Sequence, residues 1–160
     1  MIATLFTSVN GLPLHPLVVH AVVVLVPLAT LGAVLVAARP RWAPGYGPLV
    51  AVAAVLGAVA ALVAQQAGEA LEVAMGYAGD PSPELLTHGR HGLYVVNLGI
   101  AFAVATVASV VLTGRLGAGT RWPRVTAWLA AALGVAATVF TVLAGDTGAA
   151  MVWGYVLGER

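Results

Sequence analysis

Residues 17–38 read LVVHAVVVLVPLATLGAVLVAA, a run of 22 residues without an acidic residue, lysine or arginine. At a rise of 1.5 Å per residue, a helix of this length covers about 33 Å, enough to cross a hydrocarbon core of about 30 Å. Three more uncharged apolar runs follow, at residues 49–68, 92–114 and 125–145. Too few residues remain outside these four runs to cover them from water in a soluble fold. We therefore predict one transmembrane domain with four spans over residues 1–160.

The composition independently favours the bilayer as the solvent of this chain. Hydrophobic residues make up 61% of the sequence and charged residues only 8%, whereas soluble domains are roughly 25% charged. There is no cysteine, which excludes disulfides and thiolate metal sites. The net charge of +1 and the absence of a basic run argue against nucleic acid as a partner.

The connections between the spans are short and marked by proline and glycine. Short connections predict antiparallel neighbours, so we expect an all-α, up-down four-helix bundle. The first connection should include both Arg39-Pro40-Arg41 and Pro44-Gly45-Tyr46-Gly47-Pro48. Ser82 and Pro83 have the sequence of an N-cap and a first helical residue, so the third helix should begin about two turns before the membrane. Pro123 should open the fourth helix.

The placement of the arginines predicts how the protein is oriented across the membrane. Five of the seven lie in the first and third connections, namely Arg39, Arg41, Arg115, Arg121 and Arg124. Positive residues favour the cytoplasmic side, so both termini are expected outside.

All the acids and histidines fall at the other, outward side of these four spans. The acids are Glu69, Glu72, Asp80, Glu84, Asp146 and Glu159, and the histidines are His15, His20, His88 and His91. Ionisable groups at membrane depth are costly unless they are paired, and they usually mark function.

Spacing predicts that several of these groups meet. Residues at i, i+4 and i+7 share one helix face, as do Gln65, Glu69 and Glu72 on the second helix and Glu84, His88 and His91 on the third. These two helices are consecutive and antiparallel, so the two stripes should meet at their outer ends. His15 and His20 on the first helix, and Asp146 on the fourth, lie at the same level.

Two interpretations of this cluster stay open. Imidazole and carboxylate suit Zn²⁺, Fe or Mn, and imidazole alone suits Cu²⁺ or the iron of a b-type haem. His20 and His91 lie at apolar depth and are the principal candidates for cofactor binding. The candidates for metal ligation are His15, His20, Glu69, Glu72, His88 and His91. Alternatively, the same groups form a hydrogen-bonded network that fixes helix packing.

The stretch Gly11-Leu12-Pro13-Leu14-His15-Pro16-Leu17-Val18-Val19-His20 resembles the opening of a bacterial four-helix membrane family called domain of unknown function 2231. Its members typically begin helix one with His-Pro-x-x-Val-His. The resemblance continues through Gly68-Glu69, His91, the Gly145-Asp146-Thr147-Gly148 turn and Trp153. The sequence departs at Ala21-Val22, where many relatives have Phe-Pro.

The resemblance implies a multi-pass protein of the bacterial cytoplasmic membrane. Some relatives are joined to Rieske-type iron–sulfur domains, which implies redox or respiratory surroundings and membrane redox-complex subunits as partners. Two functions remain open: a metal- or haem-binding redox protein, and a structural or accessory subunit. A homo-oligomer is compatible with both. No motif supports an enzyme, and no ionisable residue in the inner half of a span offers a proton relay.

Overall fold

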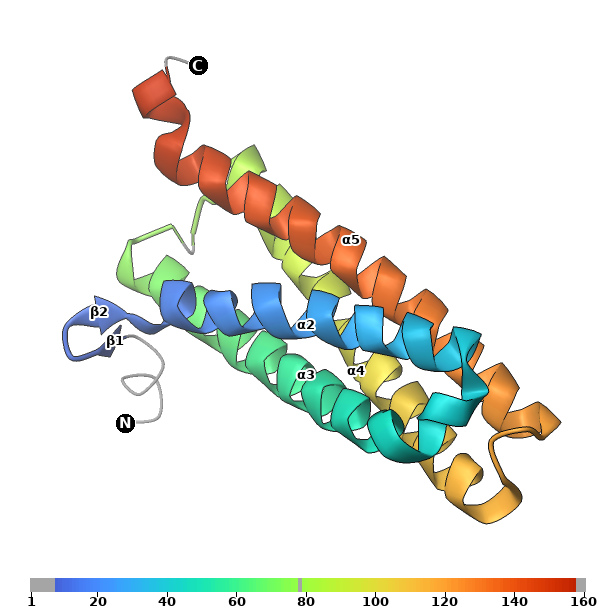
Figure 1. The fold of residues 1–160 in the computed structure, drawn as a ribbon. Coiled ribbons are helices and arrows are strands. Elements are labelled where there is room, and N and C mark those ends of the chain that lie inside the picture. Colours follow the sequence, from blue (N-terminus) through green and yellow to red (C-terminus); the bar gives the residue numbers. More distant parts are fainter. Residues whose placement is uncertain (1–7, 78, 158–160) are drawn as a thin grey trace.

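The structure, a computed structural model, describes residues 8–77 and 79–157 and consists mainly of long helices (Figure 1). They are α2 (Leu14–Ala38), α3 (Ala43–Ala74), α4 (Pro83–Leu116) and α5 (Arg121–Leu157). All four are long and apolar enough to cross a membrane. The prediction of an all-α membrane protein with four spans is therefore confirmed.

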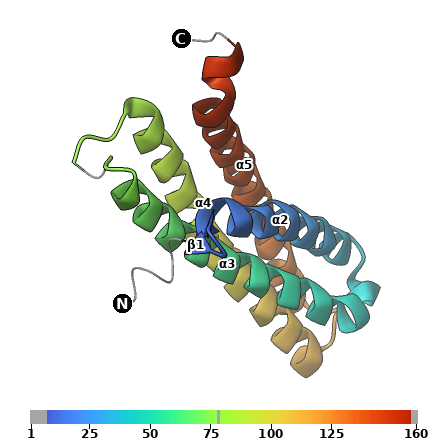
Figure 2. The ribbon, with the colours of Figure 1, turned by 90° about the vertical axis from the view of Figure 1, so that its left-hand side faces the viewer.

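The helices close into a ring. α2 packs against α3 and α5, and α4 packs against the same two helices. The start of α2, the end of α3, the start of α4 and the end of α5 lie at one end of the bundle, as an up-down topology requires. Figures 1 and 2 show the last turns of α5 extending beyond the start of α2.

The interior is packed with small side chains. Most buried apolar residues are alanine, and Phe102 and Val26 are the largest side chains that are fully buried. Phe102 of α4 lies against Gly134 of α5, where an added Cβ would come within 3.0 Å of the phenyl ring and 2.7 Å of the Thr30 hydroxyl. Thr138 donates a hydrogen bond of 3.0 Å to Thr30. Small residues of this kind allow close helix approach in a bilayer.

The first connection is shorter than the sequence predicted. It consists of Arg39 and the 3-10 helix η1 (Pro40–Trp42), and α3 already includes the whole stretch 44–48. A proline in the first helical turn removes no intrahelical hydrogen bond, so Pro44 is compatible with a helix start. Gly47 is used in packing, since an added Cβ would lie 3.3 Å from Val110 of α4. The expectation that 44–48 is a connection was wrong, since α3 continues through Pro48, which lies inside the helix at the cost of one intrahelical hydrogen bond.

The predicted start of the third helix is confirmed. Ser82 is the N-cap of α4, its hydroxyl accepts a hydrogen bond of 3.2 Å from the Leu85 amide, and Pro83 is the first helical residue. α5 begins at Arg121, so Pro123 lies in its first turn rather than at its first position.

A small hairpin precedes α2 and was not predicted. β1 (Ser8–Val9) pairs antiparallel with β2 (Leu12–Pro13). The two connecting residues, Asn10 and Gly11, have φ values of 51° and 80°, as a type I′ turn requires. The Asn-Gly dipeptide is the sequence signal for this turn.

Candidate functional site

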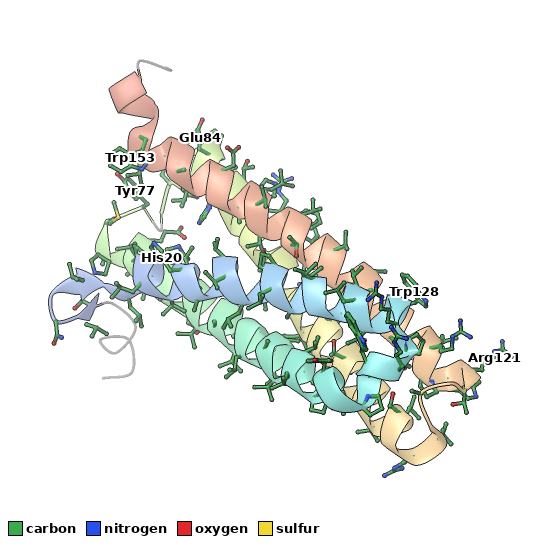
Figure 3. All side chains as sticks on the ribbon, in the orientation of Figure 1. His20, Tyr77, Glu84, Arg121, Trp128 and Trp153 are labelled. Atoms are coloured by element: carbon green, nitrogen blue, oxygen red, sulfur yellow. The ribbon has the colours of Figure 1, made fainter. Side chains whose placement is uncertain are left out.

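The ionisable groups gather where α2 and α4 begin and α3 and α5 end. Figure 3 shows His20, Tyr77, Glu84 and Trp153 at this end, which we call the histidine end, and Arg121 and Trp128 towards the other.

His15 lies in the first turn of α2 and contacts α3. Its Nδ1 atom is 2.7 Å from the backbone carbonyl oxygen of Ala64, and the ring is half-buried. Gly68, one turn further along α3, makes this approach feasible, because an added Cβ would lie 3.0 Å from Nδ1 and 3.1 Å from Cε1 of His15. The imidazole thus joins the start of α2 to the end of α3.

His88 makes the corresponding contact between α4 and α5. Its Nδ1 atom is 3.0 Å from the carbonyl oxygen of Ala144 and 3.3 Å from the Thr147 hydroxyl oxygen. Here the neighbouring glycine is Gly148, where an added Cβ would lie 3.1 Å from Cε1 of His88.

The same contact therefore occurs twice. In each pair of helices, a histidine near the start of one helix approaches an alanine carbonyl on the next helix, and a glycine follows that alanine by four residues. The sequence signal is an Ala-x-x-x-Gly spacing at 64–68 and again at 144–148, which sequence reasoning missed. Residues 145–148 were expected to form a turn, but they are helical. Thr147 donates to the carbonyls of Leu143 and Ala144 within that helix.

The two contacts fix the tautomers of both rings. A carbonyl oxygen only accepts hydrogen bonds, so each Nδ1 must carry the proton, and in the neutral ring Nε2 keeps a lone pair. The ring centroids of His15 and His88 are 6.0 Å apart, with planes inclined at 80°. One imidazole pair thus connects the α2–α3 contact with the α4–α5 contact.

His91 lies one turn beyond His88 on α4. Its Nδ1 atom is buried and has no hydrogen-bond partner among the residues that the structure describes. The centroid of the His91 ring is 6.2 Å from the centroid of the Phe140 ring. The centroids of the Phe140 and Tyr94 rings are 4.7 Å apart. A buried polar atom without a partner costs about 1–3 kcal/mol.

His20 does not join this cluster. It is exposed, and its Nδ1 atom is 2.6 Å from the carbonyl oxygen of Pro16 on its own helix. Five residues correspond to about 500°, which leaves His20 about 140° around the helix from His15. The expectation that His20 faces the bundle interior was therefore wrong, because His15 already occupies the inner face.

The carboxylates also lie away from the imidazoles. Glu69 is exposed and accepts a hydrogen bond of 3.1 Å from Gln65 on its own helix, which agrees with their predicted shared face. Glu72 is half-buried, Glu84 and Asp146 are exposed, and Glu159 lies outside the described residues. Within residues 8–77 and 79–157, no three His, Asp or Glu side chains are grouped so that they could hold a metal ion. The prediction that the stripe of Glu69 and Glu72 on α3 meets the histidine stripe on α4 is therefore not confirmed.

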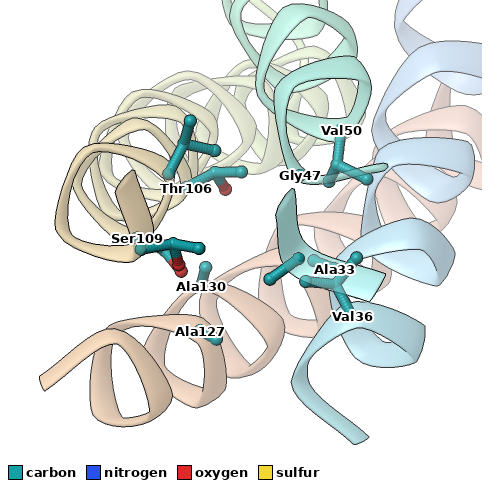
Figure 4. Close-up of a pocket in the computed structure, with 11 residues that line it drawn as sticks. Ala33, Val36, Gly47, Val50, Thr106, Ser109, Ala127 and Ala130 are labelled. Carbon is teal, nitrogen blue, oxygen red and sulfur yellow. The ribbon is translucent and has the colours of Figure 1, made fainter. Parts of the chain in front are cut away.

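A cavity near the opposite end of the bundle, which we call the arginine end because Arg39, Arg41, Arg115, Arg121 and Arg124 lie there, offers no competing site. It lies between all four helices and has a volume of about 20 Å³, which is room for about one water molecule. Figure 4 shows its lining of alanine, glycine and valine, and the polar members are Thr106, Ser109 and Thr113. The hydroxyls of Thr106 and Ser109 donate to the carbonyls of Phe102 and Pro123, and no lining side chain is titratable. The histidine end is therefore the candidate site.

Comparison with known proteins agrees with the membrane fold. Residues 11–160 match the family described as "Predicted membrane protein (DUF2231)". Because the match covers nearly the whole chain, the protein belongs to this family. No curated protein and no solved structure gave a match.

Proposed function

We propose that this family member is a structural membrane bundle that serves as an accessory subunit, with His15 and His88 fastening its histidine end. The observation that supports the fastening role is the repeated contact of an imidazole Nδ1 with an alanine carbonyl on the next helix, at 2.7 Å and 3.0 Å. In both rings the N–H group is used for helix packing.

The energies of such contacts fit a packing role. Interhelical hydrogen bonds in membrane proteins average about 0.6 kcal/mol and reach about 1.7 kcal/mol. The two contacts lie at the start of α2 and of α4, where the apolar core gives way to polar termini. They thus add a polar link between helices beside the apolar cluster that includes Ala64.

The test compares His15→Ala and His88→Ala with His20→Ala, whose ring bonds only to its own helix. We expect each of the first two substitutions to lower the free energy of unfolding in detergent by about 1–2 kcal/mol. Backbone amide exchange at the histidine end should also become faster. His20→Ala should change stability by less than about 0.5 kcal/mol. Equal stability of all three variants would refute the fastening role.

A second candidate function rests on the two Nε2 lone pairs. A carbonyl at Nδ1 is the usual partner of a metal-binding histidine. The ring centroids of His15 and His88 are 6.0 Å apart, so these two residues are the ones that would hold a metal ion or haem. We therefore propose, as the alternative, a two-histidine site for a transition metal or b-type haem. Haem iron, Fe, Cu or Mn would supply one-electron chemistry at such a site, whereas Zn²⁺, which is not redox-active, would not.

A visible spectrum and metal analysis of the protein purified in mild detergent separate the two functions. A Soret band, or stoichiometric Zn, Fe, Cu or Mn, that is lost in His15→Ala and His88→Ala but kept in His20→Ala would favour the alternative. Neither signal, even after reconstitution with haem or metal, would favour the structural function.

We also propose a location in the bacterial cytoplasmic membrane with both termini outside. The support is the grouping of Arg39, Arg41, Arg115, Arg121 and Arg124 at the end opposite the histidines, because positive residues favour the cytoplasmic side.

A further inference from the structure

Asn97 is a polar side chain on the outer surface of α4. It is exposed, and so are the apolar residues one turn away on the same face, Leu93 and Ile100. Val104, two turns towards the arginine end, is 64% exposed. The carboxamide therefore points away from the bundle, towards the space that lipid fills.

The position along α4 places Asn97 at hydrocarbon depth. It lies seven residues, or about 10 Å, from Arg90 and 18 residues, or about 27 Å, from Arg115. Both arginines are exposed and belong in the headgroup layers. A hydrocarbon layer of about 30 Å centred between the two arginines would begin about 4 Å from Arg90 along α4. Asn97 therefore lies about 6–7 Å inside the hydrocarbon layer.

A carboxamide at this depth needs a partner. It has two N–H donors and one acceptor oxygen, and leaving them unsatisfied in hydrocarbon is costly. Two buried threonines of the spans satisfy their hydroxyls internally, Thr106 on the Phe102 carbonyl and Thr141 on the Ala137 carbonyl. Asn97 has no such hydrogen bond within the described part of the chain.

We propose that a second copy of this chain binds along this face of α4, with Asn97 paired to Asn97. Two copies inserted with the same topology are related by a two-fold axis along the membrane normal, so residues at equal depth meet. A carboxamide is self-complementary, since its N–H can donate to the oxygen of an identical group. The surrounding exposed residues have alternating spacings of four and three, which is the pattern of a left-handed helix pair: Leu93, Asn97, Ile100, Val104, Val107 and Val111.

The outer face of α3 lacks this feature and provides the control. Val52, Val59 and Leu62 are exposed there, and they are apolar. The exposed carboxamide of α3, Gln66, lies 25 residues, or about 37 Å, from Arg41 and so reaches headgroup level, where water satisfies it. Among the helix residues that the structure describes, only those of α4 therefore present a carboxamide to the hydrocarbon in this way.

The absence of native cysteine allows a direct test by cross-linking in liposomes. Ile100→Cys and Val104→Cys should form disulfide-linked dimers under a mild oxidant, whereas Val52→Cys and Val59→Cys on α3 should not. Cross-linking on α3 and not on α4 would overturn the proposal. So would a protein that stays monomeric at all protein-to-lipid ratios, or one that binds only a different membrane protein through α4.

Dimer dissociation measured by energy transfer in liposomes tests the carboxamide itself. Asn97→Leu should weaken dimerisation about 3- to 20-fold, the range for one interhelical polar contact in a membrane, while Asn97→Gln should retain most of the affinity. Monomer stability in Asn97→Leu should be unchanged, because the side chain lies outside the bundle. Equal dimerisation by wild type and Asn97→Leu would overturn the pairing. The inference does not rest on the histidine contacts, so His15→Ala should dimerise like the wild type.

Discussion

The substitution Gly148→Ala tests the packing of His88 against α5. The new Cβ would lie 3.1 Å from Cε1 and 3.4 Å from Nδ1 of His88, so the ring must move by a few tenths of an ångström. That movement stretches the 3.0 Å contact between Nδ1 and the Ala144 carbonyl. Loss of one such hydrogen bond costs about 0.5–1.5 kcal/mol. Overpacking adds to this cost.

The opposing effect is helix propensity, which favours alanine over glycine by about 1 kcal/mol. Gly145→Ala, three residues earlier in α5, isolates this gain because an added Cβ there meets nothing within 4 Å. We therefore expect Gly148→Ala to be less stable than Gly145→Ala by about 1–2 kcal/mol. The assay is reversible chemical unfolding in micelles, followed by circular dichroism.

The comparison is repeated in a His88→Ala background. Without the ring, Gly148→Ala should become as favourable as Gly145→Ala, since the two substitutions then differ only in position along one helix. If Gly148→Ala matches Gly145→Ala in both backgrounds, the ring does not pack as described and the reasoning fails.

Three more outcomes follow from the fold. His91→Leu removes a buried nitrogen without a described partner, so stability in the unfolding assay should stay equal or rise by about 1 kcal/mol; a clear loss would show that His91 has a partner. Gly134→Ala should lower stability by about 1–3 kcal/mol, because the new Cβ would lie 2.7 Å from the Thr30 hydroxyl, and a neutral result would contradict the close packing. Thr120→Cys, in the α4–α5 connection, should react with a membrane-impermeant maleimide only after cells are permeabilised; labelling of intact cells would reverse the proposed orientation.

The four spans could be predicted because hydrophobic length alone determines them. A run such as 17–38 has no alternative to a membrane-crossing helix in a chain with so little polar surface. The Ser82 cap was predictable for a similar local reason. A serine hydroxyl that can accept from the first free amides, followed by a proline at the first helical position, marks a helix start within a few residues.

The helix faces were harder to predict. His15 and His20 both lie near the start of α2, and depth alone favoured His20, but the angle of about 140° between them allows only one to face inward. The spacing of His88 and His91 gave their shared inner face correctly. The carbonyl partners of His15 and His88 could not be deduced, because a main-chain acceptor has no residue-type signature. The glycines that leave space for the two imidazole rings can be recognised in the sequence, although glycine is common throughout this chain.

The most direct test of the fastening role is the tautomer of each histidine, read from ¹⁵N shifts of the imidazole nitrogens in micelles or bilayers. The spectra are recorded at a pH where the rings are neutral, with single His→Ala variants for assignment. The structure predicts that His15 and His88 carry the proton on Nδ1, bonded to the Ala64 and Ala144 carbonyls, with Nε2 bare. A proton on Nε2 of either ring would contradict it.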